Sequence, residues 1–153
     1  MSEIKSRFAG PEHSPGYQLW RVTNLWQQRM RAALAPHGLT HVQFVLLAVA
    51  SWLTRDVDAV VTQIQVAEAA GTDEMMTSQV LRTLEKNGLI RREPHPTDAR
   101  ARRLVVTEVG RSTAAAAMVD VETADVAFFE AVADVDGLTS TLRSLVERHR
   151  EGV

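Results

Sequence analysis

Apolar side chains recur every three or four residues along most of this chain, a spacing typical of amphipathic helices. The first such stretch covers residues 17–36 and is followed by Gly38, which is expected to end it. Thr40 and Gln43 have the spacing of a capping box, which predicts a second helix through Leu53. The apolar positions of the first helix are Leu19, Val22, Trp26, Met30 and Ala33. Two amphipathic helices therefore open the chain.

A helix-turn-helix follows these two helices. A short third helix is predicted over residues 63–70 and stops at Gly71, and Thr72 is predicted to cap a fourth helix that Gly88 ends. The inward side of the fourth helix is predicted to be Met76, Val80, Leu81 and Leu84. Its free side is predicted to be Met75, Thr77, Ser78, Gln79 and Arg82, although at least one methionine is expected to pack in the core. A tight glycine-containing turn would hold the second helix rigidly, with a polar face exposed.

After Leu89 the apolar period changes from helical to alternating. Residues 89–93 and 103–107 are predicted strands, and the proline-containing loop between them completes a β-hairpin. Thr107 is expected to cap a long fifth helix over residues 108–133, and Gly137 introduces a last helix. The predicted fold is mainly α with a small β-hairpin wing: a winged helix-turn-helix with six helices, in which the N- and C-terminal helices form a dimerisation region.

Composition places the 153-residue chain among ordinary soluble proteins, with 45% hydrophobic and 24% charged residues. The absence of cysteine excludes disulfides and thiolate chemistry, and it suits a cytoplasmic location. The longest apolar run, about residues 44–53, is too short to cross a bilayer. Residues 1–16 are expected to be a flexible arm.

Charge is distributed unevenly along the chain. Between residues 79 and 103, seven basic side chains face three acidic ones, whereas residues 107–136 hold seven acidic side chains and one arginine. A local basic surface of this kind suits phosphate binding, although a solvated charged surface would look the same by composition.

No catalytic or metal-binding motif is apparent. His37 and His41 have the spacing of a helical metal pair, but Gly38 and the cap at Thr40 interrupt the helix between them. Phosphate-binding loops, serine nucleophile elbows and zinc-peptidase motifs are lacking. We therefore expect no cofactor, no metal and no enzymatic activity.

Three sequence strings resemble the MarR family of winged-helix transcriptional regulators. The string LEKNGLIRR, residues 84–92, resembles the end of the family's recognition helix, and VVTEVG, residues 105–110, resembles its strand-to-helix junction. Asp98-x-Arg100 resembles the acid-x-arginine signature of its wing, although Ala101 replaces the acid that often follows the arginine. The resemblance covers residues 17–150.

This resemblance implies a single MarR-type domain over residues 17–153. Its winged-helix part would be about residues 40–107, and its dimerisation part about residues 17–36 and 108–150. The implied function is that of a ligand-responsive repressor that binds an inverted-repeat operator in double-stranded DNA as a homodimer. The alternative is a winged-helix module that binds protein, such as an antirepressor or scaffold.

Candidate DNA contacts lie on the fourth helix and the wing. Ser78, Gln79 and Arg82 are predicted to contact base edges, although each could contact a phosphate instead. The resemblance implies that Arg100 enters the minor groove and that Asp98 orients it; alternatively, the two residues form a pair that stabilises the loop. The full set of predicted DNA contacts is Thr77, Ser78, Gln79, Arg82, Arg91, Asp98, Arg100, Arg102 and Arg103.

The resemblance also implies a small aromatic or anionic effector, bound between the dimerisation helices and the winged-helix part. The candidate residues are Tyr17, Trp20, Trp26, His41 and Phe44. Trp20 is favoured because it flanks the apolar stripe of the first helix, whereas core packing is the alternative for any one of these aromatics.

Overall fold

The computed structural model describes residues 5–56 and 58–150. Its helices are α1 (Pro15–Leu34), α2 (His41–Leu53), α3 (Gln63–Ala70), α4 (Glu74–Lys86), α5 (Glu108–Phe129) and α6 (Val135–Arg150). Two strands, β1 (Ile90–Pro94) and β2 (Arg102–Val106), pair as an antiparallel hairpin between α4 and α5. The predicted order of elements and the predicted fold class are therefore confirmed.

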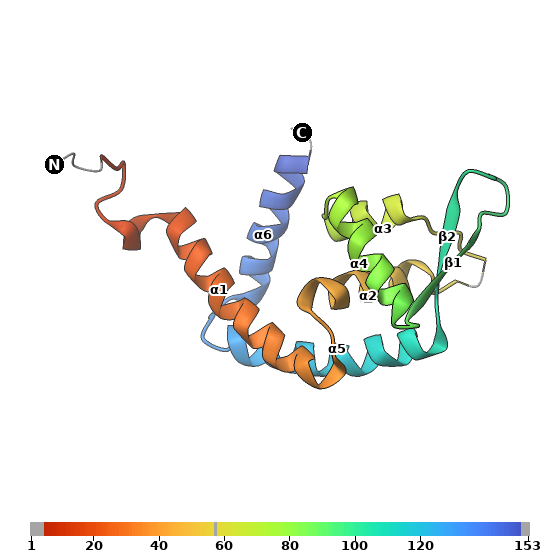
Figure 1. Cartoon of the computed structure of the whole chain (residues 1–153). Helices are drawn as coiled ribbons and strands as arrows, with labels where there is room; N and C mark the ends of the chain where they lie inside the picture. Colours follow the sequence, from red (N-terminus) through yellow and green to blue (C-terminus); the bar gives the residue numbers. More distant parts are fainter. Residues whose placement is uncertain (1–4, 57, 151–153) are drawn as a thin grey trace.

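Helix α5 joins the two halves of the molecule (Figure 1). One half contains α2, α3, α4 and the hairpin, while the N-terminal part of α1 and helix α6 extend from the other. Helix α5 packs against both α1 and α2. Within the described residues no single helix is long and apolar enough to cross a bilayer; α1 with its extension and α2 reach that length only together, across a 71° bend.

The hydrophobic core lies where α2, α4 and the hairpin meet the C-terminal end of α1. Its largest fully buried apolar side chains are Met30, Leu34, Leu46, Leu47, Val66, Leu81, Leu84 and Ile90. Ala114, Ala117 and Val121 of α5 close this core from one side. The helix-turn-helix and the wing are thereby fixed to the long helix that supports them.

Local capping agrees with most of the sequence predictions. Thr40 and Thr62 both form the predicted capping boxes, at the starts of α2 and α3. Gly71 and Gly88 have left-handed φ angles of 67° and 73°, which end α3 and the α4 region as expected. The predicted cap of α4 is wrong, because Asp73 rather than Thr72 accepts the N–H group of Met76, at 2.8 Å.

The junction between β2 and α5 depends on close packing at Gly110. Thr107 caps α5 by accepting the N–H group of Gly110, and its hydroxyl donates to the carbonyl of Gly88 at 2.7 Å. A Cβ atom at Gly110 would overlap the carbonyl oxygen of Leu89. Glycine at this position therefore allows α5 to begin directly against the turn that ends α4.

Several helix boundaries differ from the predicted ones, among them the end of α5, which lies at Phe129 rather than at about residue 133. Helix α1 begins at Pro15, and a short 3-10 helix precedes it at Pro11–His13, so the predicted arm of residues 1–16 contains ordered turns. Residues 1–4 of that arm lie outside the described residues. Helix α6 begins before Gly137, because the carboxylate of Asp134 accepts the N–H group of Gly137 at 2.8 Å.

Candidate nucleic-acid interface

The outward face of α4 carries a straight stripe of exposed side chains. Thr77, Leu81 and Leu84 are buried, so the residues on the opposite side of the helix point away from the core. These residues are Met75, Gln79, Arg82 and Lys86, spaced by four, three and four positions, and all four are exposed. Ser78 is half-buried at the edge of this stripe. We call these four residues the α4 stripe.

Thr77 does not belong to the free surface that the sequence predicts. Its side chain is 0% exposed, and its hydroxyl donates to the carbonyl of Asp73 at 2.7 Å. The hydroxyl of Thr72 lies 2.7 Å from it. The predicted placement of Thr77 on the free side of the helix is therefore wrong, because this side chain ties the first turn of α4 to the preceding turn. Met76 is correspondingly more exposed than the predicted inward position would allow.

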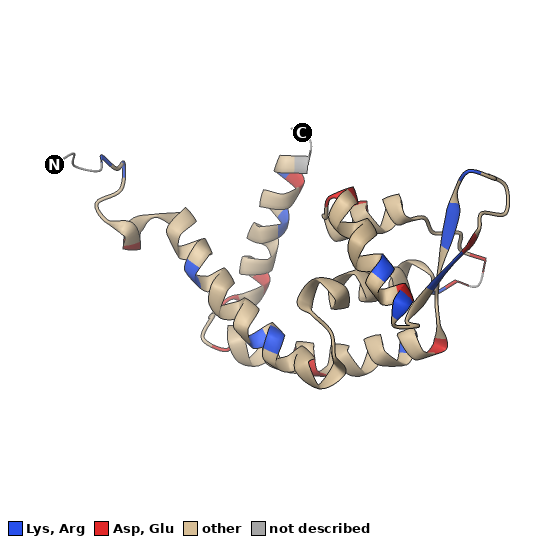
Figure 2. Ribbon diagram, viewed as in Figure 1, with Lys and Arg blue, Asp and Glu red and all other residues tan. Residues whose placement is uncertain are grey.

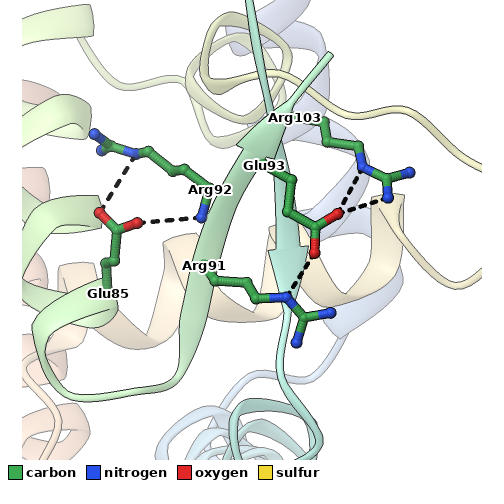
Figure 3. Close-up of polar contacts among 5 residues, drawn as sticks. All are labelled: Glu85, Arg91, Arg92, Glu93 and Arg103. Carbon is green, nitrogen blue, oxygen red and sulfur yellow. Dashed lines mark hydrogen bonds and ion pairs between the residues drawn. The ribbon is translucent and has the colours of Figure 1, made fainter. Parts of the chain in front are cut away.

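The base of the wing is held by a carboxylate between two arginines (Figure 3). Glu93 of β1 lies opposite Arg103 of β2 in the strand register. Its Oε2 atom lies 2.6 Å from Nη2 of Arg103, and its Oε1 atom lies 2.7 Å from Nε of Arg91. The hydrogen bond from Arg91, followed by that from Arg103, lowers the pKa of Glu93 below its ordinary value. Two of the predicted DNA-binding arginines are thus paired within the hairpin.

A second pairing ties the wing to the helix-turn-helix. Glu85, near the end of α4, accepts the backbone N–H group of Arg92 at 3.1 Å and lies 3.9 Å from its Nε atom (Figure 3). The guanidinium of Arg92 also donates to Gln63 at the start of α3, at 3.5 Å. One arginine of β1 therefore contacts both helices of the motif.

The tip of the wing, which we define as the loop of residues 95–101 together with Arg102 at the start of β2, differs from the base, which contains Arg91, Glu93 and Arg103. Within the described residues, the side chains of Arg100 and Arg102 form no hydrogen bond or ion pair. Asp98 accepts the backbone N–H group of Arg100 at 2.9 Å, so it shapes the loop without binding the Arg100 guanidinium. The Asp98–Arg100 side-chain ion pair considered as an alternative is not formed. Ala101 closes the same loop through its backbone, with bonds to Asp98 and His95.

The same contrast extends to α4. In the part of the chain that the structure describes, Arg82 and Lys86 have no ion-pair partner, unlike Arg91, Arg92 and Arg103. In this half of the molecule, Figure 2 shows basic residues on α4 and the hairpin and also near the start of α5. Among the basic residues of α4 and the hairpin, those without an ion pair in the described residues thus lie on the outward helix face and the wing tip, where a polyanion could reach them.

A second candidate site is a groove of about 650 Å³ between α1 and α2. Its lining residues are Gln27, Arg31, Ala35, Leu39, Thr40, His41, Val42, Val45 and Thr72. The ring of His41 bonds to Gln27 at 2.9 Å and meets Trp26 edge to face, with centroids 4.9 Å apart. Burial lowers the pKa of His41 below its ordinary value, with a smaller opposing effect of Asp125. The indole N–H group of Trp26 donates to Asp125 at 2.7 Å.

The predicted effector residues are only partly brought together. His41 lines the groove, and Trp26 contacts the ring of His41. Phe44 is 5% exposed, packs in the core and does not line the groove. Tyr17 and Trp20 are exposed on the N-terminal part of α1 and do not line the groove. Sequence reasoning missed Gln27 and Arg31 as groove residues. Their signal was a pair of polar residues four positions apart on the first helix.

No three His, Asp or Glu side chains cluster as a metal site requires, within residues 5–56 and 58–150. His37 instead lies with its Nε2 atom 2.7 Å from the carboxylate of Asp120. This contact connects the end of the α1 region to α5.

Comparison with known proteins places this geometry in a family. The model of the MarR family matches residues 39–101, from just before α2 to the wing tip. The HTH-type transcriptional regulator YdcH of Bacillus subtilis (strain 168), itself uncharacterised, is 42% identical over 145 residues, which are 95% of this chain and 98% of YdcH. The chain belongs to the MarR family. This MarR-family protein is a transcriptional regulator, and the family predicted from the three sequence strings is confirmed.

Solved structures of MarR-family regulators have the same fold. The transcriptional repressor CouR bound to a 23-mer DNA duplex superposes with a TM-score of 0.79 at 28% identity, over 95% of this chain and 99% of CouR. CouR from Rhodococcus jostii RHA1 bound to p-coumaroyl-CoA gives a TM-score of 0.77 at 27% identity, over 90% of this chain and 94% of that one. The winged helix-turn-helix of this MarR-family chain is therefore found in a regulator that has been solved with DNA.

Proposed function

We propose that this MarR-family regulator is a ligand-responsive repressor that binds an inverted-repeat operator as a homodimer. One observation carries the proposal: the α4 stripe and the wing tip hold cations that no acidic side chain of the described residues neutralises. A recognition helix enters the major groove, and a wing reaches the neighbouring backbone or minor groove. The similar repressor CouR has been solved on a DNA duplex, which supports this assignment.

The proposed contacts follow from the exposure of each side chain. Ser78, Gln79 and Arg82 would contact base edges, since glutamine pairs well with adenine and arginine with guanine. Arg100 would enter the minor groove from a loop that Asp98 shapes, and Arg102 would contact phosphate. Arg91 and Arg103 would hold the wing in shape through Glu93 rather than bind DNA.

Exposed apolar side chains on the other half of the molecule support a homodimer. They lie on α1, α5 and α6, and include Tyr17, Leu19, Trp20, Val22, Leu25, Val119, Val126, Leu142, Leu145 and Val146. A surface with so many exposed apolar side chains is rarely left uncovered on a monomer, and the same helices of a second copy, related by two-fold symmetry, would cover it. Residues 17–36 and 108–150 would thus form the dimerisation part, and residues 40–107 the winged-helix part. The two half-sites would lie about 10 to 10.5 base pairs apart.

The groove between α1 and α2 suits an aromatic acid. Arg31 supplies a cation for a carboxylate, and the apolar residues Leu39, Val42 and Val45 supply a surface for a ring. CouR has been solved with p-coumaroyl-CoA, an aromatic acyl thioester, which supports this ligand class. A bound effector would act by favouring a dimer geometry in which the winged-helix parts no longer match the operator. The protein would work in the cytoplasm, without a catalytic step.

Selection from a pool of random DNA duplexes, followed by a salt titration, tests the proposed function. A dimer that neutralises several phosphates should lose affinity steeply between about 50 and 200 mM salt, with a log-log slope near −0.9 per contact. Weak binding with a slope near zero would contradict DNA recognition and favour the protein-binding alternative. Addition of small aromatic acids to the complex then tests the effector, with Arg31→Gln as the variant expected to lose the response.

A further inference from the structure

Met75 is exposed in a way that the dimer does not explain. Its side chain is 85% exposed, the largest exposed fraction among the large apolar residues that the structure describes. Many of the other exposed apolar residues lie on α1, α5 and α6, where a second copy would cover them. Met75 instead begins the α4 stripe, one helical turn before Gln79. An apolar side chain therefore stands at the leading end of the surface proposed to face DNA.

The position of Met75 on the helix matters for what it can reach. It is the second residue of α4, after the cap at Asp73, and the N-terminal residues of a recognition helix contact base edges. The residues that follow it on the same side, Ser78 and Gln79, are polar. Met75 thus has no apolar partner along the α4 stripe and would find one only in the major groove of DNA.

We propose that Met75 recognises the C5-methyl group of a thymine in each operator half-site. The major groove presents hydrogen-bond donors and acceptors at every base pair, and the thymine methyl is its apolar group. A methionine side chain donates no hydrogen bond and adapts its shape readily, so it gains most from contact with that methyl. Met75 would therefore add a preference for thymine that Gln79 and Arg82 cannot supply. This inference rests on the proposed DNA binding.

Replacement of thymine by deoxyuridine tests the contact, because it removes the methyl group and leaves base pairing unchanged. Each thymine of the selected operator is replaced in turn, and the affinity of the wild-type protein is measured. At one thymine in each half-site, replacement by deoxyuridine should lower the affinity about fourfold, the factor that burial of one methyl group supplies. Replacement in both half-sites should lower the affinity about sixteenfold, the product of the two effects.

Variants of Met75 assign the effect to this side chain. Met75→Ala and Met75→Gln should bind the thymine and deoxyuridine operators equally, whereas Met75→Leu should keep most of the preference. Met76→Ala is the matched control, because Met76 is the next residue in the helix but lies off the stripe, and it should keep the full preference. The salt slope of Met75→Ala should equal that of the wild type, since no phosphate contact is lost.

The outcomes separate this inference from the proposed function. Retention of the wild-type thymine preference by Met75→Ala would overturn the inference while leaving DNA binding intact. A wild-type protein that binds its operator but has no deoxyuridine-sensitive position would do the same. A wild-type protein that binds no duplex in a salt-dependent manner would overturn both.

Discussion

The base and the tip of the wing contain the same residue type but use it differently. At the base, Arg91 and Arg103 share the carboxylate of Glu93, which the strand register places between them. At the tip, Arg100 and Arg102 are exposed, and no ion pair in the described residues engages them. The number of arginines in the hairpin is therefore larger than the number that lack an acidic partner in the described residues.

The paired and the unpaired arginines would have two different roles, which a count of charges along the sequence does not distinguish. The paired arginines fix the shape of the hairpin and, through Arg92 and Glu85, its angle to α4. The unpaired cations of the tip and of the α4 stripe remain free to displace counterions from a phosphate backbone. A salt titration of DNA binding should distinguish the two groups, because only the unpaired cations are expected to contribute to its slope.

The largest expected effect is that of Arg100→Ala. Loss of the wing-tip guanidinium should weaken operator binding at least about tenfold, because a desolvated contact in the minor groove is lost. Operator affinity is measured by fluorescence anisotropy, with size-exclusion chromatography to verify that the dimer persists. Unchanged affinity of a folded dimer would mean that the tip does not contact DNA.

Glu93→Gln should leave the arginines at the base of the wing without an acidic partner, as those at the tip are. The variant keeps the size of the side chain but removes the charge that engages Arg91 and Arg103. Binding to non-specific duplex should tighten about two- to fivefold at low salt, and the salt slope should steepen by about one to two contacts. A slope equal to that of the wild type would mean that these arginines already contact phosphates or cannot reach them.

Thr77 and Ser78 offer the same contrast within α4. Thr77→Val removes a buried, hydrogen-bonded hydroxyl and should lower the free energy of unfolding by about 1 to 3 kcal/mol, with operator affinity of the folded protein nearly unchanged. Ser78→Ala should leave stability within about 0.5 kcal/mol and weaken operator binding instead. Chemical denaturation and anisotropy measure the two quantities. The reverse assignment of effects would show that the orientation of α4 is wrong.

The smallest expected effect is a pH dependence of the protein's stability that arises from His41 in the groove between α1 and α2. His41 has a pKa below its ordinary value of 6.5, because burial disfavours the charged ring. The unfolded chain then binds the proton more readily than the folded one, so stability is full above pH 6.5 and declines as pH falls towards the lower folded pKa. The melting temperature should fall more in the wild type than in His41→Gln between about pH 7.5 and 5.5. Equal decreases in the melting temperatures of the two proteins would show that His41 does not cause the pH dependence of stability.

Effector binding should respond to pH in the opposite direction. An anion beside Arg31 and His41 favours the protonated ring, so binding of an aromatic acid should tighten as pH falls. Calorimetry in buffers of different ionisation enthalpy would detect the proton uptake. The His41→Gln variant should bind without it.

Local signals explain why most of the fold was predictable. The capping threonines at positions 40, 62 and 107 and the glycines at 71 and 88 act within one helical turn, so the sequence alone identifies them. The cap of α4 was not predictable in the same way, because Thr72 and Asp73 are both good capping residues. The burial of Thr77 does not depend on the cap, because Thr77 lies one turn before Leu81 and two turns before Leu84 and so shares their buried face.

The pairing of the arginines required information that the local sequence lacks. Glu93 faces Arg103 only once the strand register is known, because the two residues lie ten positions apart in the sequence. The groove was harder still, since its lining combines α1 and α2 with Thr72 of the turn before α4. Residues brought together by tertiary packing leave no periodic signal in the sequence.

The central claim is that pairing within the hairpin decides which arginines bind DNA. The most direct test compares the salt slopes of operator binding for Arg91→Ala and Arg102→Ala, two single arginine deletions within the same hairpin. The slope should remain near the wild-type value for Arg91→Ala and become shallower by about 0.9 per protomer for Arg102→Ala. Equal reductions for the two variants would contradict the claim.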